Sequence, residues 1–302
     1  MLNLASAFDS MTGDKMNKEN LEDKYIKVQG VNTRYWVSGN EGTDLILIHG
    51  LGSYMEEWQN NVELFSQNHR VFVLDLPGSG RSDKPAVHYS FPYFSQFVLD
   101  FMDGQGIERA LLVGNSMGGG VSQHVAIQAP DRVAGLVLVN SAGFSQELAI
   151  SLRVCSLPLI GELLCHPSRK GVLWGLKECV HDASLITDEM VEFGYQIMSQ
   201  PGATKAFLAT LRALVNMTGL KKQVLRSFTE NHNSIKAPTL VVWGQQDRLL
   251  PVSGAKVAGK GIPNSTVHIF DPCGHMPHLE RPEEFNTLVE NFISEPGKVV
   301  LG

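Results

Sequence analysis

The stretch Gly114-Asn115-Ser116-Met117-Gly118 decides how this sequence is interpreted. An apolar run, Ala110-Leu111-Leu112-Val113, comes directly before it, and a run typical of a helix begins at Gly118. This order predicts a strand, a tight turn and a helix, with Ser116 at the tip of the turn. A side chain at Gly114 or Gly118 would clash with the neighbouring strand or helix, and so tight a turn strains the serine backbone. We therefore expect the Ser116 hydroxyl to stand out over the edge of a sheet.

The pattern Gly-x-Ser-x-Gly alone occurs by chance in roughly one chain in ten of this length, so its meaning depends on the rest of the chain. Continuously apolar runs predict strands buried on both faces, as in a parallel sheet. These runs are residues 45–48, 71–74, 110–113 and 133–139, and two further strands are expected at 239–243 and 266–270. Helical stretches are expected near 56–67, 94–104, 121–128, 254–259 and 282–293, and an antiparallel hairpin over 25–28 and 33–37. Alternating strands and helices predict a mostly parallel sheet with helices on both faces.

The alternation of strands and helices stops after Phe144 and resumes near Ala237. Helical patterns rich in Leu, Met, Phe and Ala fill the interval. We expect a flexible tail over residues 1–22, an α/β core built from 23–143 and 236–302, and a helical insertion over 144–235.

Composition excludes several classes of function. A net charge of −6 and a pI near 5.9 argue against nucleic-acid binding, which needs a basic face. No apolar run approaches the about 18 residues of a transmembrane helix, and the first twenty residues do not resemble a signal peptide. The four cysteines show no Cys-x-x-Cys spacing, so we expect reduced thiols, no zinc site and a cytoplasmic location.

A serine hydroxyl needs a base to remove its proton, and the base needs an acid to orient it. In open α/β sheets such groups gather at the carboxyl ends of the strands. Asp247 follows the strand at 239–243, and His275 follows the strand at 266–270. Serine, then acid, then histidine is the order expected of α/β-hydrolases.

Five motifs in this order resemble those of the α/β-hydrolase superfamily over about residues 24–294. They are His49-Gly50-Leu51-Gly52, Asp75-Leu76-Pro77-Gly78-Ser79-Gly80-Arg81-Ser82, Gly114-Asn115-Ser116-Met117-Gly118-Gly119, Trp243-Gly244-Gln245-Gln246-Asp247 and Gly274-His275. The chain is similar to the capped serine hydrolases of the esterase, lipase and meta-cleavage-product hydrolase branch. The resemblance implies an α/β-hydrolase fold: a mostly parallel eight-stranded sheet flanked by helices, with a helical cap inserted after strand 6.

The resemblance also implies the roles of the site residues. Ser116 would be the nucleophile, His275 the general base and acid, and Asp247 the acid that orients the histidine. The backbone N–H groups of Leu51 and Met117 would form the oxyanion hole, where losing one donor typically costs about 10²–10³ in rate. No metal and no organic cofactor would be needed.

Other polar residues near these motifs are expected to be structural. His49 would shape the oxyanion loop, and Asp75 and Arg81 would be satisfied within their own loop. Some family members place the acid after the sixth strand, but Asn140 in that region cannot act as a carboxylate.

The family contains several activities. Epoxide hydrolases and haloalkane dehalogenases use an aspartate nucleophile, so the serine at 116 disfavours them. Meta-cleavage-product hydrolases, which cut carbon–carbon bonds in dienoic keto acids, share the Gly-Asn-Ser-Met-Gly-Gly signature. They usually have a Ser-Gly-x-Gly oxyanion loop and a tryptophan just after the histidine, whereas this chain has His49-Gly50-Leu51-Gly52 and Met276. Their anionic substrate should meet a cap arginine, for which Arg153, Arg169 and Arg212 are candidates.

The insertion is strongly apolar, and most of its apolar side chains are expected to form its own core. As candidates for an apolar acyl pocket we take Phe144, Leu148, Phe207 and Leu211. Few basic residues flank 149–164, which weighs against a membrane-surface role for that stretch.

The sequence therefore predicts a serine hydrolase of the carboxylesterase or lipase type (EC 3.1.1) that cleaves small esters of apolar acyl groups through an acyl-enzyme. Two alternatives stay open: a carbon–carbon bond hydrolase of meta-cleavage-product type, and a small-ligand receptor with slow turnover.

Overall fold

The structure is a computed structural model that describes residues 21–295. The tail predicted for residues 1–22 lies outside the described residues, apart from its last two positions. None of the helices between residues 21 and 295 combines the length and hydrophobicity needed to span a bilayer.

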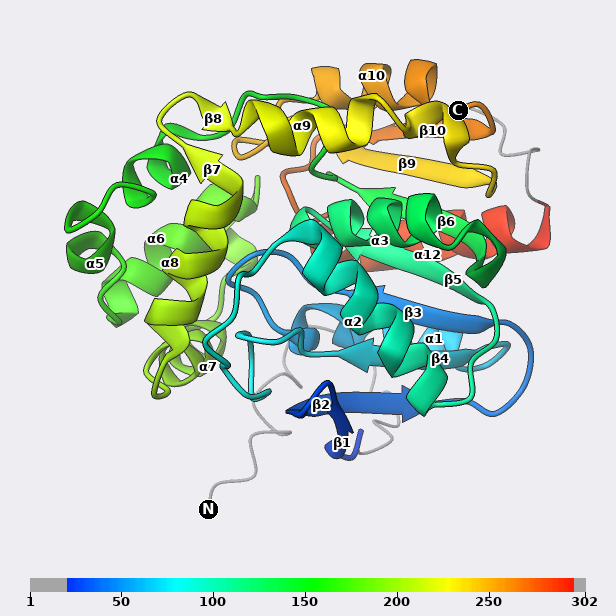
Figure 1. Cartoon of the computed structure of the whole chain (residues 1–302), viewed down its shortest axis with the longest axis horizontal. Helices are drawn as coiled ribbons and strands as arrows, with labels where there is room; N and C mark the ends of the chain where they lie inside the picture. Colours follow the sequence, from blue (N-terminus) through cyan, green and yellow to red (C-terminus); the bar gives the residue numbers. More distant parts are fainter. Residues whose placement is uncertain (1–20, 296–302) are drawn as a thin grey trace.

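One eight-stranded sheet forms the centre of the molecule, with strand order β1-β2-β4-β3-β5-β6-β9-β10 (Figure 1). Its strands are β1 (Lys24–Val28), β2 (Val31–Ser38), β3 (Asp44–Ile48), β4 (Arg70–Leu74), β5 (Ala110–Asn115), β6 (Val133–Val139), β9 (Thr239–Gly244) and β10 (Ser265–Phe270). The pairs β1–β2 and β2–β4 are antiparallel, and every other neighbouring pair is parallel. The predicted mostly parallel sheet is confirmed, including the hairpin at its start.

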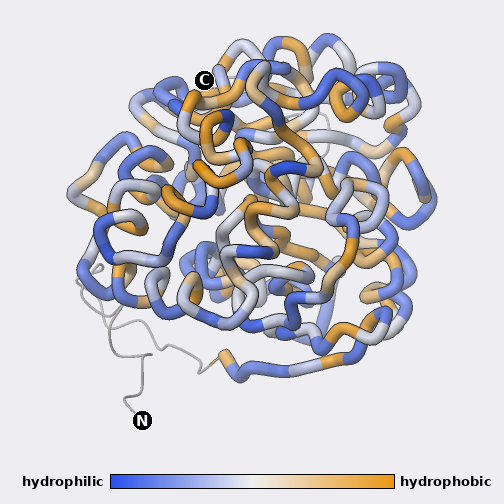
Figure 2. The backbone as a smooth tube through the Cα atoms, turned by 60° about the vertical axis from the view of Figure 1, so that its left-hand side comes forward, coloured by the Kyte–Doolittle hydropathy of each residue, from blue (hydrophilic) through white to orange (hydrophobic). Residues whose placement is uncertain are grey.

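Helices cover both faces of the sheet because successive strand residues alternate between two apolar cores. Ile46 and Ile48 of β3 belong to one core, whereas Leu45 and Leu47 belong to the other. The first core is completed by α2 (Phe91–Gly104), α3 (Met117–Gln128) and α10 (Ser253–Gly261), and the second by α1 (Gln59–Phe65) and α12 (Pro282–Ser294). Figure 2 shows hydrophobic stretches gathered toward the middle of the molecule, with hydrophilic stretches over much of its outside.

Two helices begin earlier than the apolar pattern predicts. Helix α2 starts at Phe91 because the Ser90 side chain accepts a hydrogen bond from the Tyr93 N–H (3.4 Å) and a proline occupies the first turn. Helix α3 starts at Met117, directly after Ser116. Its first turn is built from glycines, which carry no apolar side chain for a periodic pattern to register.

The chain between β6 and β9 is mostly helical, as the sequence indicates for 144–235, although those domain boundaries stay a prediction. Figure 1 shows α4–α8 gathered at one end of the sheet, beyond the carboxyl ends of the parallel strands. The elements between β6 and β9 are α4 (Ile150–Cys155), α5 (Ile160–Leu164), α6 (Arg169–Cys179), η4 (Ala183–Leu185), α7 (Asp188–Met198), α8 (Ala203–Leu214), β7 (Val215–Asn216), β8 (Gly219–Leu220), α9 (Lys222–Thr229) and η5 (His232–Ser234). Short elements elsewhere are η2 (Met55–Trp58), η3 (Pro130–Arg132) and α11 (Pro277–Glu280).

The glycines around Ser116 should be hard to replace. A Cβ at Gly118 would lie 2.2 Å from the Ile48 carbonyl oxygen, so we expect Gly118→Ala to lower the free energy of unfolding by about 2–4 kcal/mol. A matched control is Gly175→Ala within α6, where an added Cβ would have nothing within 4 Å. That change should instead raise stability by about 0.5–1 kcal/mol. Urea unfolding measures the free energy of unfolding of both variants. Equal changes in the two would contradict the predicted clash at Gly118.

Candidate active site

Ser116 occupies a strained turn between β5 and α3, as the sequence predicts. Its backbone angles, φ of 55° and ψ of −114°, lie in a region that residues other than glycine rarely adopt. The neighbouring structure holds this conformation: the Ser116 N–H donates to the Val139 carbonyl (2.9 Å), and its own carbonyl accepts from the Ala142 N–H (3.0 Å). A Cβ at Gly114 would lie 2.4 Å from the Gly118 backbone, so only glycines permit the turn.

Asp247 and His275 meet because the strands that precede them are parallel neighbours. The ends of β9 and β10 are paired in register, which brings the following loops together. The His275 Nδ1 and the Asp247 Oδ2 lie 2.8 Å apart, and both side chains are buried. The other oxygen of Asp247 accepts the N–H groups of Leu249 (2.8 Å) and Leu250 (3.0 Å). These bonds hold the carboxylate toward the imidazole.

Asn140 is a third member of this cluster that the sequence analysis considered only as a non-carboxylate. Its Nδ2 donates to the Asp247 Oδ2 (2.6 Å) and to the Gly274 carbonyl (3.3 Å). Its Oδ1 accepts from the Gly244 N–H (3.3 Å). The signal for this role is positional: Asn140 follows β6, and β6 pairs with β9, which leads to Asp247.

Ser116 and His275 line the same cavity. The side chain of Asn115 links the two loops, because its Nδ2 donates to the His275 carbonyl (3.0 Å). Among residues 21–295 no hydrogen bond joins the Ser116 hydroxyl to the His275 ring. Such bonds often tighten only when a substrate is bound.

The loop after β3, residues 49–54, lies against the serine turn. A Cβ at Gly50 would be 3.3 Å from the Ser116 Cβ. His49 shapes this loop: its Nδ1 donates to the Gly50 carbonyl (2.7 Å), and its Nε2 accepts from the Leu76 N–H (3.0 Å). Burial lowers the pKa of His49, which is consistent with this neutral tautomer.

The two backbone N–H groups predicted to form an oxyanion hole are placed at this junction. Leu51 lines the cavity, and its N–H has no acceptor within the described chain. Met117 is the first residue of α3, and the first N–H groups of a helix have no intrahelical acceptor. Donors at a helix N-terminus favour negative charge.

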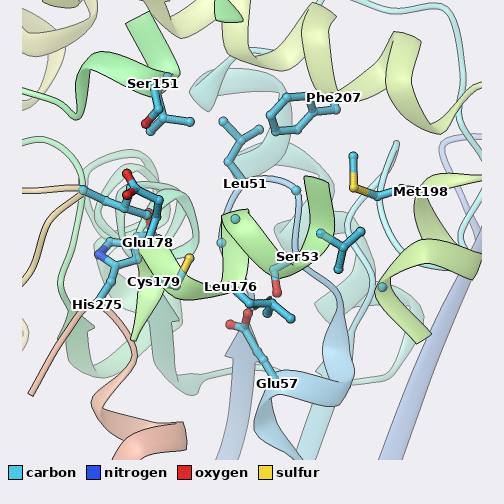
Figure 3. A pocket seen from close by; sticks show the side chains of 18 of the residues that line it. Leu51, Ser53, Glu57, Ser151, Leu176, Glu178, Cys179, Met198, Phe207 and His275 are labelled. Carbon is cyan, nitrogen blue, oxygen red and sulfur yellow. Dashed lines mark hydrogen bonds between the residues drawn. The ribbon is translucent and has the colours of Figure 1, made fainter. Parts of the chain in front are cut away.

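Glu57, a buried carboxyl group next to this loop, was not predicted from the sequence to belong to the site. The Ser53 hydroxyl donates to Oε2 of Glu57, as Figure 3 shows from the side of the pocket. Burial raises the pKa of Glu57 to about 8. Its Oε1 lies 3.7 Å from the Nε2 of His278, whose pKa burial lowers to about 3 and whose ring stacks on Trp58. Both pKa shifts favour the neutral forms, and the two side chains lie near each other without a hydrogen bond between them.

The inserted helices are bonded directly to the histidine loop. The His275 N–H donates to the carbonyl of Cys179, the last residue of α6 (2.7 Å). Glu280 adds a second link, because one oxygen accepts from the Gly274 N–H (2.8 Å) and the other from the His181 N–H (2.7 Å). The position of His275 thus depends on the insertion as well as on the sheet.

A cavity of about 1200 Å³ lies between the carboxyl ends of the strands and the inserted helices. Leu148 and Phe207 line it, as expected for two of the four pocket candidates, and Figure 3 shows Phe207 and Leu51 among the lining side chains. The other two candidates require correction. Phe144 packs instead against His232, with ring centroids 4.8 Å apart, and Leu211 is fully buried in the first core. Apolar lining residues that the sequence analysis did not select include Val172, Leu176, Met190, Ile197 and Met198.

Comparison with known proteins gives consistent matches over most of the chain. The model of the alpha/beta hydrolase family matches residues 45–288. The 2-hydroxymuconate semialdehyde hydrolase of Pseudomonas putida is 32% identical over 261 residues, which cover 84% of this chain and 88% of that protein.

Two solved structures are similar as well. A meta-cleavage product hydrolase from Pseudomonas fluorescens IP01 has a TM-score of 0.78 and 28% identity, covering 91% of this chain and 98% of its own. A putative lipase from Acinetobacter baumannii AYE has a TM-score of 0.80 and 26% identity, covering 91% of each chain.

The buried carboxyl of Glu57 should make stability depend on pH. Its pKa is about 8 in the folded chain against 4.5 for the ordinary group, so the folded state binds more protons between these values. The free energy of unfolding should fall as pH rises from about 4.5 to 8, by up to about 1.4 kcal/mol per pH unit. Glu57→Gln should remove this contribution, whereas Glu41→Gln, at an exposed position, should not. Urea titrations across this range measure the slopes, and identical slopes in wild type and Glu57→Gln would refute the assignment.

Proposed function

This chain belongs to the alpha/beta hydrolase family, and from that premise we propose that it is a serine hydrolase acting on carboxylic esters of apolar acyl groups. The observation that carries the proposal is the convergence of Ser116 with the bonded pair His275–Asp247 at one cavity. Ser116 would be the nucleophile, His275 the base and Asp247 the orienting acid.

The acylation step follows from this arrangement. The Ser116 oxygen attacks the ester carbonyl carbon while the His275 Nε2 takes the hydroxyl proton. Asp247 accepts the Nδ1–H bond and stabilises the imidazolium that forms. The N–H groups of Leu51 and Met117 stabilise the developing oxyanion. His275 then returns the proton to the departing alcohol, which leaves an acyl group on Ser116.

Deacylation repeats these roles with water. His275 removes a proton from a water molecule, which attacks the acyl carbonyl carbon, and the resulting acid leaves as Ser116 recovers its proton. Apart from the water molecule and the ester, these two steps use only side chains and backbone groups of this chain.

The cavity supports an apolar acyl group as the substrate moiety. Helices α6 and α7 contribute aliphatic and methionine side chains to its lining, and methionines adapt to varied shapes. We also propose that the segment 144–235 acts as a cap over this cavity.

A carbon–carbon bond hydrolase is the second candidate, because two of the similar proteins are named as a semialdehyde hydrolase and a meta-cleavage product hydrolase. The electrostatics of the lining favour the ester instead. Arg153, Arg169 and Arg212 are absent from the lining residues and bond to Met217, Glu192 and Glu162 respectively.

The acidic side chains that line the cavity are Glu56, Glu147, Glu178 and Asp247, besides Glu57, whose raised pKa favours its neutral form, and the cationic ones are Lys84 and Arg248. Lys84 is already bonded to three oxygens, and Arg248 donates to the Lys177 carbonyl. An anionic dienoate would therefore meet little free positive charge.

A substrate panel should separate the candidates. We expect turnover of p-nitrophenyl esters of graded chain length and no cleavage of a coloured dienoate, followed by absorbance. Dienoate cleavage without ester turnover would select the second candidate. Binding without turnover faster than about 1 s⁻¹ would indicate a small-ligand receptor.

Ser116→Ala should abolish covalent labelling by a fluorophosphonate and lower kcat for esters by at least about 10³-fold, because no other group on this turn can accept the acyl group. Ser122→Ala is a matched control, since that buried hydroxyl only donates to the Gly118 carbonyl within α3. Peptide mass spectrometry locates the label. A folded wild-type protein labelled elsewhere would disprove the assignment.

Asn140→Ala should lower kcat about 10- to 100-fold with little change in KM. The change removes a hydrogen bond to a charged carboxylate, worth about 1.5–3 kcal/mol, and frees Asp247 to rotate away from His275. Asn264→Ala, which loses only a bond to the Lys236 carbonyl at the surface, serves as control. Steady-state kinetics on one ester measures both, and a pure KM effect would show that Asn140 does not act through Asp247.

A further inference from the structure

Large apolar side chains are exposed around helices α4, α5 and α6. Ile150 is 71% exposed, Leu159 83% and Leu163 77%. The set, here called the entrance patch, consists of Ile150, Leu159, Ile160, Leu163, Leu164 and Trp174. Soluble proteins seldom leave apolar groups of this size together in water without a partner.

The entrance patch is continuous with the cavity that contains Ser116. Ile150, Leu164 and Trp174 line this cavity and are also 71%, 56% and 54% exposed. These side chains therefore lie where the cavity meets the surface. A partner that covers the patch would therefore lie at the entrance of the cavity.

Hydrogen bonds hold α5 and the turn before it in place, so the exposure of their apolar side chains is a feature of the folded chain. The Arg212 guanidinium donates to the carbonyls of Ser156 (3.1 Å) and Leu157 (3.0 Å), in the turn between α4 and α5. It also pairs with Glu162 of α5 (2.6 Å). Gly161 packs so tightly that an added Cβ would lie 2.2 Å from the Cys155 carbonyl oxygen.

The chemistry of the patch fits a lipid surface. Trp174 is 54% exposed, whereas the chain's other three tryptophans are at most 6% exposed, and tryptophan favours the boundary between apolar chains and water. Arg212 neutralises Glu162, the only carboxylate of α5. Helix α6 adds one acid, Glu178, against the exposed Lys170 and Lys177, which make no side-chain ion pair within the described chain. Apolar groups bordered by cations suit lipid acyl chains beneath phosphate headgroups.

We propose that the entrance patch docks on the surface of a phospholipid bilayer, from which an apolar ester enters the cavity without crossing water. The proposal rests on the ester hydrolase function and names its substrate class as membrane-dissolved lipid esters. The scarcity of basic residues in 149–164 weighed against such a role, but the cations that border the patch come from the next helix.

Vesicle binding tests the docking directly. The double variant Leu159→Ser/Leu163→Ser changes two exposed patch residues that do not line the cavity. We expect its binding to vesicles of phosphatidylcholine with one-fifth phosphatidylglycerol to fall at least about tenfold in flotation assays. The matched control is Val257→Ser/Ile269→Ser, which changes two side chains that are 42% and 41% exposed on α10 and β10. The control should bind like wild type, and absence of wild-type binding would overturn the proposal.

Tryptophan fluorescence locates the contact. Brominated phosphatidylcholine should quench part of the wild-type emission and none of the Trp174→Phe emission, because Trp36, Trp58 and Trp243 are buried. Equal quenching in both proteins would place the lipid contact elsewhere and overturn the proposal.

Activity separates a failure of docking from a failure of the proposed function. The Leu159→Ser/Leu163→Ser variant should keep wild-type turnover of soluble p-nitrophenyl butyrate and lose at least about tenfold on a long-chain ester held in vesicles. Equal losses on both substrates would contradict docking. No ester turnover by wild type would refute the hydrolase function, while flotation would still decide the docking.

Light scattering tests whether a second copy of the chain covers the patch instead. A wild-type dimer that the variant converts to monomers, with unchanged vesicle binding, would overturn docking on a bilayer.

Discussion

The close contact between the start of α3 and the end of β3 is the constraint on which the site depends. Gly118 lies so near the Ile48 and His49 carbonyl oxygens that no side chain fits between them. The contact forces the turn at Ser116 into its unusual backbone conformation and sets the loop after β3 beside it. The same contact places the first N–H of α3 and the Leu51 N–H, for which residues 21–295 offer no acceptor. One steric requirement thus places the proposed nucleophile and its proposed oxyanion donors together.

The remaining groups of the site are held by hydrogen bonds between loops. Asn115 bonds to the His275 backbone, Asn140 bonds to Asp247, and Glu57 bonds to Ser53 beneath the loop after β3. The first two links join segments that different strands deliver to the same edge of the sheet, and the third ties the loop after β3 to η2. Buried polar groups of this kind are costly unless they are paired, so they favour a single arrangement of the loops.

The sequence predicted the sheet well because its central parallel strands are mostly continuous apolar runs, and the order of Ser116, Asp247 and His275 follows the order of the strands. It predicted less of what supports the site. Asn140 and Asp247 are 107 residues apart, and their contact depends on β6 and β9 being neighbours, which no local pattern encodes. The sequence around Glu57 is typical of a helix with an exposed acid, and only the structure shows that this side chain is buried. Phe144 and Leu211 were selected for their hydrophobicity, which does not distinguish a core position from a pocket wall.

The hydrogen bond from the His275 N–H to the Cys179 carbonyl has a consequence for engineering. Exchanging the inserted helices between relatives is an obvious way to alter substrate preference. In this chain the exchange would also replace the acceptor that holds the histidine backbone. A transplanted insertion would need to return a carbonyl to the same point, so the inserted helices and the histidine loop have to be redesigned as one unit.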